Sequence, residues 1–274
     1  MAVLEIFTVC KKGSAASRLS PDQRNGVLGK GKADIYDEGK LTQGMIRVPL
    51  AKVHERIGPM DTRDELTQKY FNGKATVDTG GVIFEVNDKA LSAGDYIGIT
   101  GAPDDSAITV RQGAAGIELI ARNPAMFDWP AEYSLVALSG TSDTMLLDEV
   151  IMIKKGLPAG IGLRLFGRQA MAAERLGIET IALEAAGSAI SSTFNGYYTW
   201  PRYGFDAGLT AAEVARLPKH LSQAATVADL MDSESGRRWW LANGAARFME
   251  FDLTAGSRSW QTLRTVLKEK GVTP

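Results

Sequence analysis

The sequence is poor in the side chains that form disulfides and bind transition metals. Cys10 is its only cysteine, which excludes an intrachain disulfide and a cysteine-based zinc site. Its two histidines, His54 and His220, lie in polar surroundings, where surface or helix-capping roles are commoner than metal ligation. We therefore expect no metal site, and a single thiol suits a reducing compartment.

Long apolar runs and a strong charge of either sign are also missing. No run approaches the roughly 20 residues that span a bilayer, and the first residues lack the cationic and apolar segments of a signal peptide. A net charge of −1 provides no global field to attract nucleic acid or an anionic membrane. We expect a cytoplasmic protein, or a particle-associated one if it belongs to an assembly, with no membrane and no nucleic acid as its partner.

The chain does contain enough apolar side chains for a sizeable core, since 45% of its residues are hydrophobic. Its first part, residues 1–75, begins with a strand-like run at 3–9. A polar, glycine-rich stretch at 11–45 follows, which we interpret as an extended arm, and a second strand-like run covers 46–53. The capping-box spacing at 62–65 predicts a helix that reaches about residue 71.

The pattern changes twice more along the sequence. Residues 76–207 hold short β-rich runs separated by turn residues, which predict an antiparallel meander, followed from 145 by a β-α-β pattern. Residues 208–274 have helix-start signals and predict a helical extension. The predicted strands are 82–86, 96–100, 107–110, 117–121 and 133–138, and the predicted helices are 210–216, 226–231, 234–242 and 257–269.

A glycine-rich turn at 156–162 is the feature that points most directly to chemistry. It stands between an apolar, strand-like run at 145–153 and a helical run at 163–176, and a second strand-like run follows at 178–183. Backbone N–H groups at such a turn can bind a phosphate, although a plain strand-to-helix turn has the same composition. Leu165 stands where the dinucleotide fingerprint has glycine, and no Gly-Lys-Ser/Thr sequence follows, so neither of these two nucleotide motifs is present.

Residues 145–206 resemble the second half of the GNAT superfamily of acetyl-CoA-dependent N-acyltransferases. Gly160-Ile161-Gly162 is similar to the family's Gly-x-Gly/Ala turn, and the helix ending in Ala-Ala-Glu-Arg-Leu-Gly before 178–183 is similar to the family's helix and fifth strand. The aromatic run from 194 ends in Tyr203-Gly204-Phe205, like the close of this unit in the family. The resemblance covers about a quarter of the chain.

This resemblance implies a mixed α+β fold: a GNAT-like twisted sheet at 76–207 flanked by helices, with the N-terminal arm and the C-terminal extension on either side. It implies acetyl or another acyl group transferred from coenzyme A to an amine of unknown identity. Glu149 and Glu184 are the implied bases, and Tyr198 or its neighbour Tyr197 the implied acid. The implied cofactor-binding residues are Met152, Ile153, Leu157, Ala159, Gly160, Ile161 and Gly162.

Two departures from the family keep a second hypothesis open. Leu157 stands where the family usually has Gln or Arg, and Pro158, often a glycine there, has no N–H to offer a phosphate. The alternative is a catalytically inactive GNAT-like structural or interaction protein, such as a component of a phage particle or another assembly, which forms a homo-oligomer or larger assembly through its N-terminal arm. Each carboxylate and tyrosine named above then has a structural role only.

The sequence Arg237-Arg238-Trp239-Trp240 is the other unusual cluster. Arginines interleaved with aromatic side chains can stack on nucleic-acid bases. A helix whose tryptophans pack on the sheet while the arginines reach solvent gives the same pattern. We favour the second interpretation because the net charge offers no wider basic surface.

Overall fold

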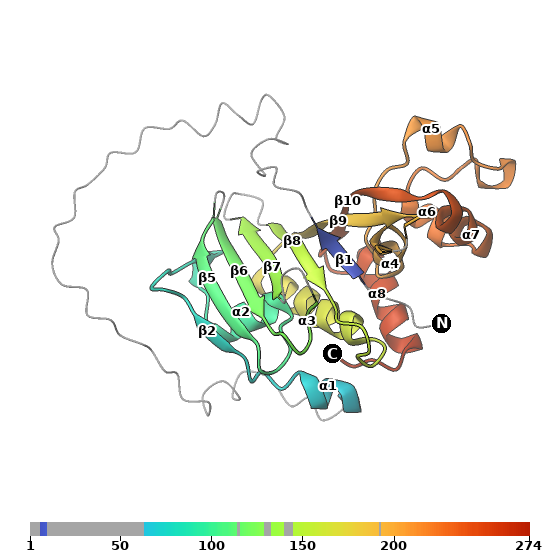
Figure 1. Cartoon of the computed structure of the whole chain (residues 1–274). Coiled ribbons are helices and arrows are strands. Elements are labelled where there is room, and N and C mark those ends of the chain that lie inside the picture. Colours follow the sequence, from blue (N-terminus) through green and yellow to red (C-terminus); the bar gives the residue numbers. More distant parts are fainter. Residues whose placement is uncertain (1–5, 10–62, 114–115, 129–132, 140–144, 192) are drawn as a thin grey trace, which may run out of the picture. The chain divides into compact units, whose positions relative to one another are not determined.

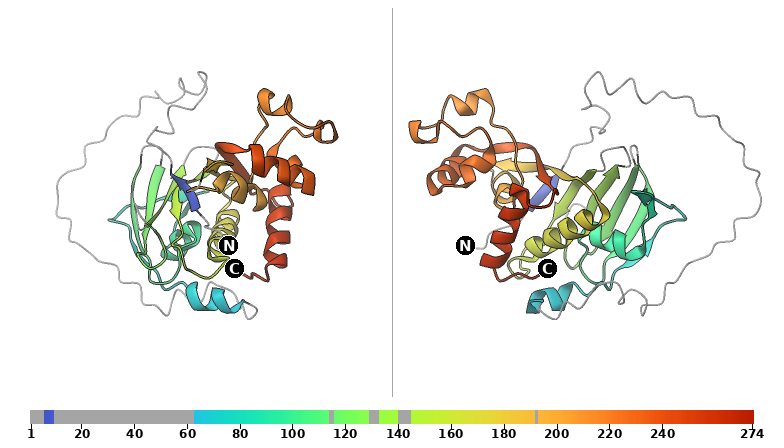
Figure 2. Two further views of the ribbon diagram at one scale, coloured as in Figure 1. Left: turned by 45° about the vertical axis from the view of Figure 1, so that its right-hand side comes forward. Right: turned by 180° about the vertical axis from the view of Figure 1, so that it is seen from behind.

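The computed structural model describes residues 6–9, 63–113, 116–128, 133–139, 145–191 and 193–274 (Figures 1 and 2). The described residues belong to one compact unit. The predicted arm at 11–45 and the predicted strand at 46–53 lie outside the described residues. Every helix in the described part of the chain is too short or too polar to cross a membrane.

The described unit is built on one eight-stranded mixed sheet (Figure 1). Four strands form an antiparallel meander, and a fifth joins it in parallel after a helical crossover. An eight-residue strand completes one end of the sheet and a three-residue strand the other. The mixed α+β class is therefore confirmed. In spatial order the strands are β10 (Ala245–Asp252), β9 (Thr180–Ser188), β8 (Met145–Met152), β7 (Tyr133–Ser139), β6 (Gly116–Arg122), β5 (Ala107–Gln112) and β2 (Thr76–Asp78), while β1 (Ile6–Val9) pairs with β8 off this path.

Helices cover the sheet and extend from its β10 edge. The longest, α3, connects β8 to the parallel strand β9, and Figure 2 shows α3 and α2 on one face of the sheet. The helices are α1 (Glu65–Tyr70), α2 (Ala93–Thr100), α3 (Ile161–Leu176), α4 (Gly196–Arg202), α5 (Ala211–Val214), α6 (Val227–Met231), α7 (Glu234–Asn243) and α8 (Arg258–Glu269), with a 3-10 turn at Lys219–Leu221 and a separate hairpin of β3 (Glu85–Val86) and β4 (Lys89–Ala90).

An aromatic cluster fixes α3 to the C-terminal half of the unit. The ring of Phe166 on α3 contacts Trp200 edge-on at 5.6 Å between centroids and Phe251 of β10 at 5.2 Å. Phe205 lies against both Trp200 and Phe251, and all four side chains are buried. Such pairs add to the burial of large apolar surfaces. The aromatic residues that carry part of the family resemblance are thus core residues of this fold.

Several local predictions need correction. Residues 96–100, predicted as a strand from their β-branched content, belong to helix α2, which begins with a capping box between Ser92 and Asp95. Helix α1 is capped by Asp64 and not by Thr62. Only Glu85–Val86 of the run 82–86 forms a strand, and β10 lies within a segment predicted as helical. The other predicted strands of the meander and the four C-terminal helices are confirmed, with boundaries a few residues different.

Asp64 joins three distant segments of the chain. Its carboxylate accepts hydrogen bonds from the guanidinium of Arg164 on α3, from the N–H groups of Leu66 and Thr67 at the start of α1, and from the N–H of Thr273 near the C-terminus. Burial alone would raise the pKa of Asp64, but the bonds from Arg164, Thr273 and Thr67 outweigh it and hold that pKa well below its ordinary value. The Asp64 side chain is therefore ionised in the folded protein at neutral pH.

Replacing Asp64 by asparagine keeps the shape of the side chain and removes its charge. Arg164 is 5% exposed, so its guanidinium would be left buried beside a neutral amide. We expect Asp64→Asn to lower the free energy of unfolding by about 3 kcal/mol, measured by denaturant titration at pH 7. The control is Glu234→Gln, which breaks an exposed ion pair with Arg238 and should change stability by less than about 0.5 kcal/mol. Equal effects of the two substitutions would contradict this account.

Candidate functional site

The glycine-rich turn leads from the end of β8 into α3. Gly156 and Gly160 both adopt left-handed backbone conformations, with φ of 90° and 83°. Gly160 is the N-cap of α3 and offers no side chain to the first turn of the helix. A Cβ atom at Gly160 would lie 2.8 Å from the guanidinium of Arg164, so glycine is required by contact as well as by conformation.

Arg164 holds the turn from inside. Its Nη1 donates to the carbonyl oxygen of Gly160 at 3.0 Å, while its Nε and Nη2 donate to Asp64. The buried guanidinium therefore makes these hydrogen bonds within the protein and not to a ligand. Cationic side chains that face solvent near the turn are instead those of Lys154 and Lys155, both exposed.

The two parallel strands beside the turn separate part-way along their length. β8 and β9 are paired from Met145 opposite Thr180 to Asp148 opposite Leu183. Beyond that point β8 takes β1 as its antiparallel partner, with Ile6 opposite Met152. The register between β7 and β8 also shifts here, because consecutive residues of β7 pair with Val150 and Asp148 and skip Glu149. The separation, the bulge and the pairing with β1 thus coincide.

The predicted cofactor-binding residues follow one another from the end of β8 into α3. Ile153, Ile161 and Gly162 are buried, and Leu157 packs against the hydrophobic core. Ala159 is exposed on the turn. Met152 is half-buried, and its backbone is the part that pairs with β1. The turn itself is thus accessible, whereas the strand edge next to it is already occupied.

The predicted acid and base residues lie on three different elements. Glu184 is half-buried on β9, opposite Phe248 of β10, and Glu149 is at the bulge in β8, where its side chain lies outside the described residues. Tyr198 is half-buried on α4, with the guanidinium of Arg202 5.7 Å from its ring centroid. These three residues therefore come from separate elements, β8, β9 and α4.

Tyr197, the other tyrosine considered, has a structural role. Its hydroxyl donates to the carbonyl oxygen of Leu241 at 2.9 Å, and its own carbonyl oxygen accepts from the indole N–H of Trp240. Burial and then the neighbouring Tyr198 raise the pKa of Tyr197 above its ordinary value. Trp240 is fully buried, and the guanidinium carbon of Arg247 lies 4.6 Å from the centroid of its ring. Both observations support the interpretation of the Arg-Trp cluster as a packed helix.

A buried carboxyl group marks the point where β8 and β9 separate. Asp148 is 2% exposed, and its Oδ1 accepts a hydrogen bond of 2.6 Å from Nε2 of Gln169 on α3. Its Oδ2 and the Oε1 of Gln169 both lack a hydrogen-bond partner among the described residues. A single proton on the carboxyl group would satisfy both oxygens, because Oδ2–H can donate back to the amide oxygen. Burial raises the pKa of Asp148 to about 7, although the bond from Gln169 opposes the rise.

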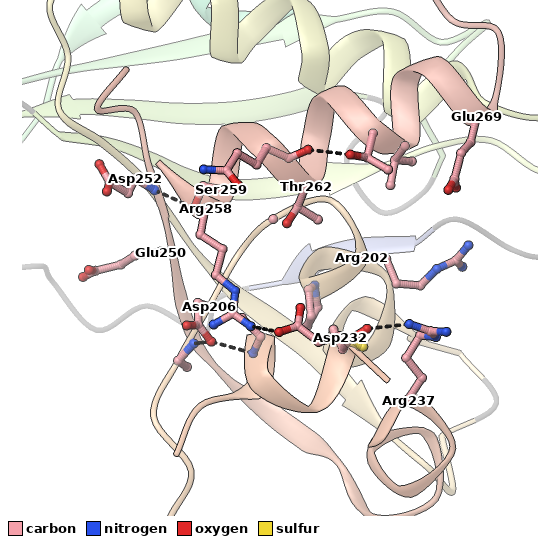
Figure 3. A pocket seen from close by; sticks show the side chains of 18 of the residues that line it. Arg202, Asp206, Asp232, Arg237, Glu250, Asp252, Arg258, Ser259, Thr262 and Glu269 are labelled. Atoms are coloured by element: carbon pink, nitrogen blue, oxygen red, sulfur yellow. Dashed lines mark hydrogen bonds and ion pairs between the residues drawn. The ribbon is translucent and has the colours of Figure 1, made fainter. Parts of the chain in front are cut away.

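A pocket lies away from the glycine-rich turn, among β10, α4, α6 and α8 (Figure 3). It is a polar groove of about 980 Å³. Arg258 spans it and pairs with Asp229 and Asp232 at 2.7 and 2.6 Å, and Arg237 donates to the carbonyl oxygen of Met231. Arg258 and Arg237 are therefore both bonded to protein atoms within the groove. The groove was not predicted, because its lining comes from residues 180–270 and is brought together only by the tertiary fold.

Comparison with known proteins gives no assignment: no family model, no curated protein and no solved structure matches the chain.

The Asp148–Gln169 pair predicts a specific dependence of stability on pH. Because the folded pKa is raised, the native state keeps a proton that the unfolded state releases, so the contribution of Asp148 to stability falls as pH rises from about 4 to 7. Asp148→Asn supplies a permanent N–H donor in the same shape. Between pH 5 and 8 we expect the wild type to lose about 2.5 kcal/mol more unfolding free energy than the variant, measured by urea titration. Parallel pH profiles would show that Asp148 is already ionised in the folded protein.

Proposed function

We propose that this chain is an N-acyltransferase of the GNAT type, which transfers an acetyl or another acyl group from coenzyme A to an amine. The observation that carries this proposal is the pair of parallel strands β8 and β9, which separate beside a glycine turn at the start of the helix that connects them. The separation leaves an edge of β8 next to a helix N-terminus, and in this structure β1 pairs with that edge. An extended ligand that ends in phosphates has the matching chemistry.

The residues present fit this ligand at the turn and only in part along the strand. Helix α3 begins at Ile161 after its N-cap Gly160, and its positive end would face the phosphates, with the exposed Lys154 and Lys155 near by. Pro158 contributes no N–H. Met152 and Ile153 would face the amide-containing arm, but the backbone at Met152 is paired with β1.

The cofactor would supply a thioester, whose carbonyl carbon is activated toward an amine. The protein has to keep the attacking amine neutral and to protonate the leaving sulfur. Glu184 on β9 and Glu149 at the bulge of β8 are the proposed proton acceptors, and Tyr198 on α4 is the proposed proton donor. N–H groups beside the turn would stabilise negative charge on the acyl oxygen.

A second candidate function is a non-catalytic GNAT-like interaction protein, such as a component of a phage particle or another assembly. The occupied edge of β8 favours it, because β1 of the chain itself takes the place along Met152 that the cofactor arm requires. The missing N–H at Pro158 favours it as well. The two candidates differ in whether acetyl-CoA binds at all.

Binding of acetyl-CoA tests the first candidate. At about 100 times its dissociation constant it should raise the unfolding free energy by roughly 2.7 kcal/mol, measured as a thermal shift and confirmed by calorimetry. Gly160→Asp should abolish the effect through its negative charge and the loss of close approach. The matched control is Gly256→Asp, at a left-handed glycine with open space around it in the turn before α8, which should leave binding unchanged.

Two outcomes would contradict the proposal. Normal binding by Gly160→Asp would show that the turn is not the phosphate site. No shift at millimolar acetyl-CoA, either in the wild type or in a variant without residues 1–11, would exclude the acyltransferase and leave the interaction protein.

A further inference from the structure

β1 is held in the fold by strands that lie far from it in the sequence. It pairs with the last residues of β8, from Val9 opposite Val150 to Ile6 opposite Met152, and it also contacts β9 and α4. Figure 1 shows it between β8 and the segment formed by β9 and α4. Residues 10–62 separate it from the rest of its compact unit. Its place therefore depends on strand pairing and not on neighbours in the sequence.

The pairing with β1 begins where the pairing with β9 ends. Asp148 opposite Leu183 is the last pair of β8 with β9, and Val150 opposite Val9 is the first with β1. Backbone N–H and C=O groups inside a protein need partners, so the edge of β8 that β9 leaves has to be filled. A short strand meets this need, and so does any extended molecule that carries amide groups in the same direction.

We propose that β1 is a removable plug on the edge of β8 that β9 leaves, and that β1 and a coenzyme A thioester exclude each other there. The exclusion rests on the proposed function, because it assumes that the cofactor arm uses the backbone of β8 at Met152. The claim that β1 docks as a separable strand does not depend on that assumption. A four-residue strand that is joined to the fold by pairing opens at a lower cost than the whole fold, so the plug sets an apparent affinity without preventing binding.

The test compares acetyl-CoA binding by the wild type with binding by a variant without residues 1–11. If β1 is detached from β8 in about a tenth of the wild-type molecules or fewer, the truncated protein should bind acetyl-CoA at least about 10-fold more tightly, measured by calorimetry. A variant without residues 1–5, which keeps β1, is the matched control and should bind like the wild type. A full-length variant with both Ile6→Pro and Phe7→Pro weakens the pairing by removing backbone donors, and should bind like the truncated protein.

A labelled peptide of residues 1–11 with Cys10→Ser gives a second readout. It should bind the truncated protein in fluorescence anisotropy and be displaced by acetyl-CoA. If acetyl-CoA binds all variants equally, the plug is overturned and the proposed function stands. If the peptide binds and acetyl-CoA binds no variant, the proposed function is overturned and docking of β1 stands. If the peptide does not bind, or if both the truncated and the proline variants unfold, β1 is an integral strand and the inference is overturned.

Discussion

A parallel strand that leaves its neighbour exposes backbone groups that must be paired again, and this constraint organises the structure around β8. The strand is paired with β9 as far as Asp148 and with β1 beyond it. In a low-dielectric interior an unpaired N–H or C=O is costly, so this edge of β8 needs a strand, a ligand or water as its partner. A ligand that binds along this edge therefore has to replace β1.

Contacts from several sides hold α3 and the glycine-rich turn in place. Gln169 on α3 holds Asp148 at the point of separation, and Phe166, one turn earlier on the same helix, is locked among Trp200, Phe205 and Phe251. At the start of the helix, Arg164 connects the turn to Asp64. Helix α3 therefore cannot shift toward the β1-paired edge of β8 without breaking buried polar pairs or the aromatic cluster.

The sequence was most informative where a local signal decides the structure. The turn at 156–162 and the capped start of α5 at Thr210 could be predicted because glycines and capping side chains act within a few residues. Residues 96–100 could not, because their β-branched content favours a strand. The helix forms through the Ser92 cap and through Gly98, where a Cβ would lie 2.7 Å from Ala172 of α3. β10 shows alternating burial at 248–252, a strand signal that the adjacent helix signals concealed.

The candidate site was harder to predict than the fold. A run of residues can be placed on a strand or a turn, but the pairing of the β8 edge with a strand from the N-terminal part of the sequence depends on the tertiary fold.

Hydrogen–deuterium exchange with and without saturating acetyl-CoA tests the exchange of partners on β8 most directly. The account predicts faster exchange at residues 6–9 on binding, while residues 150–152 stay protected. Unchanged protection at residues 6–9 with acetyl-CoA fully bound would contradict it.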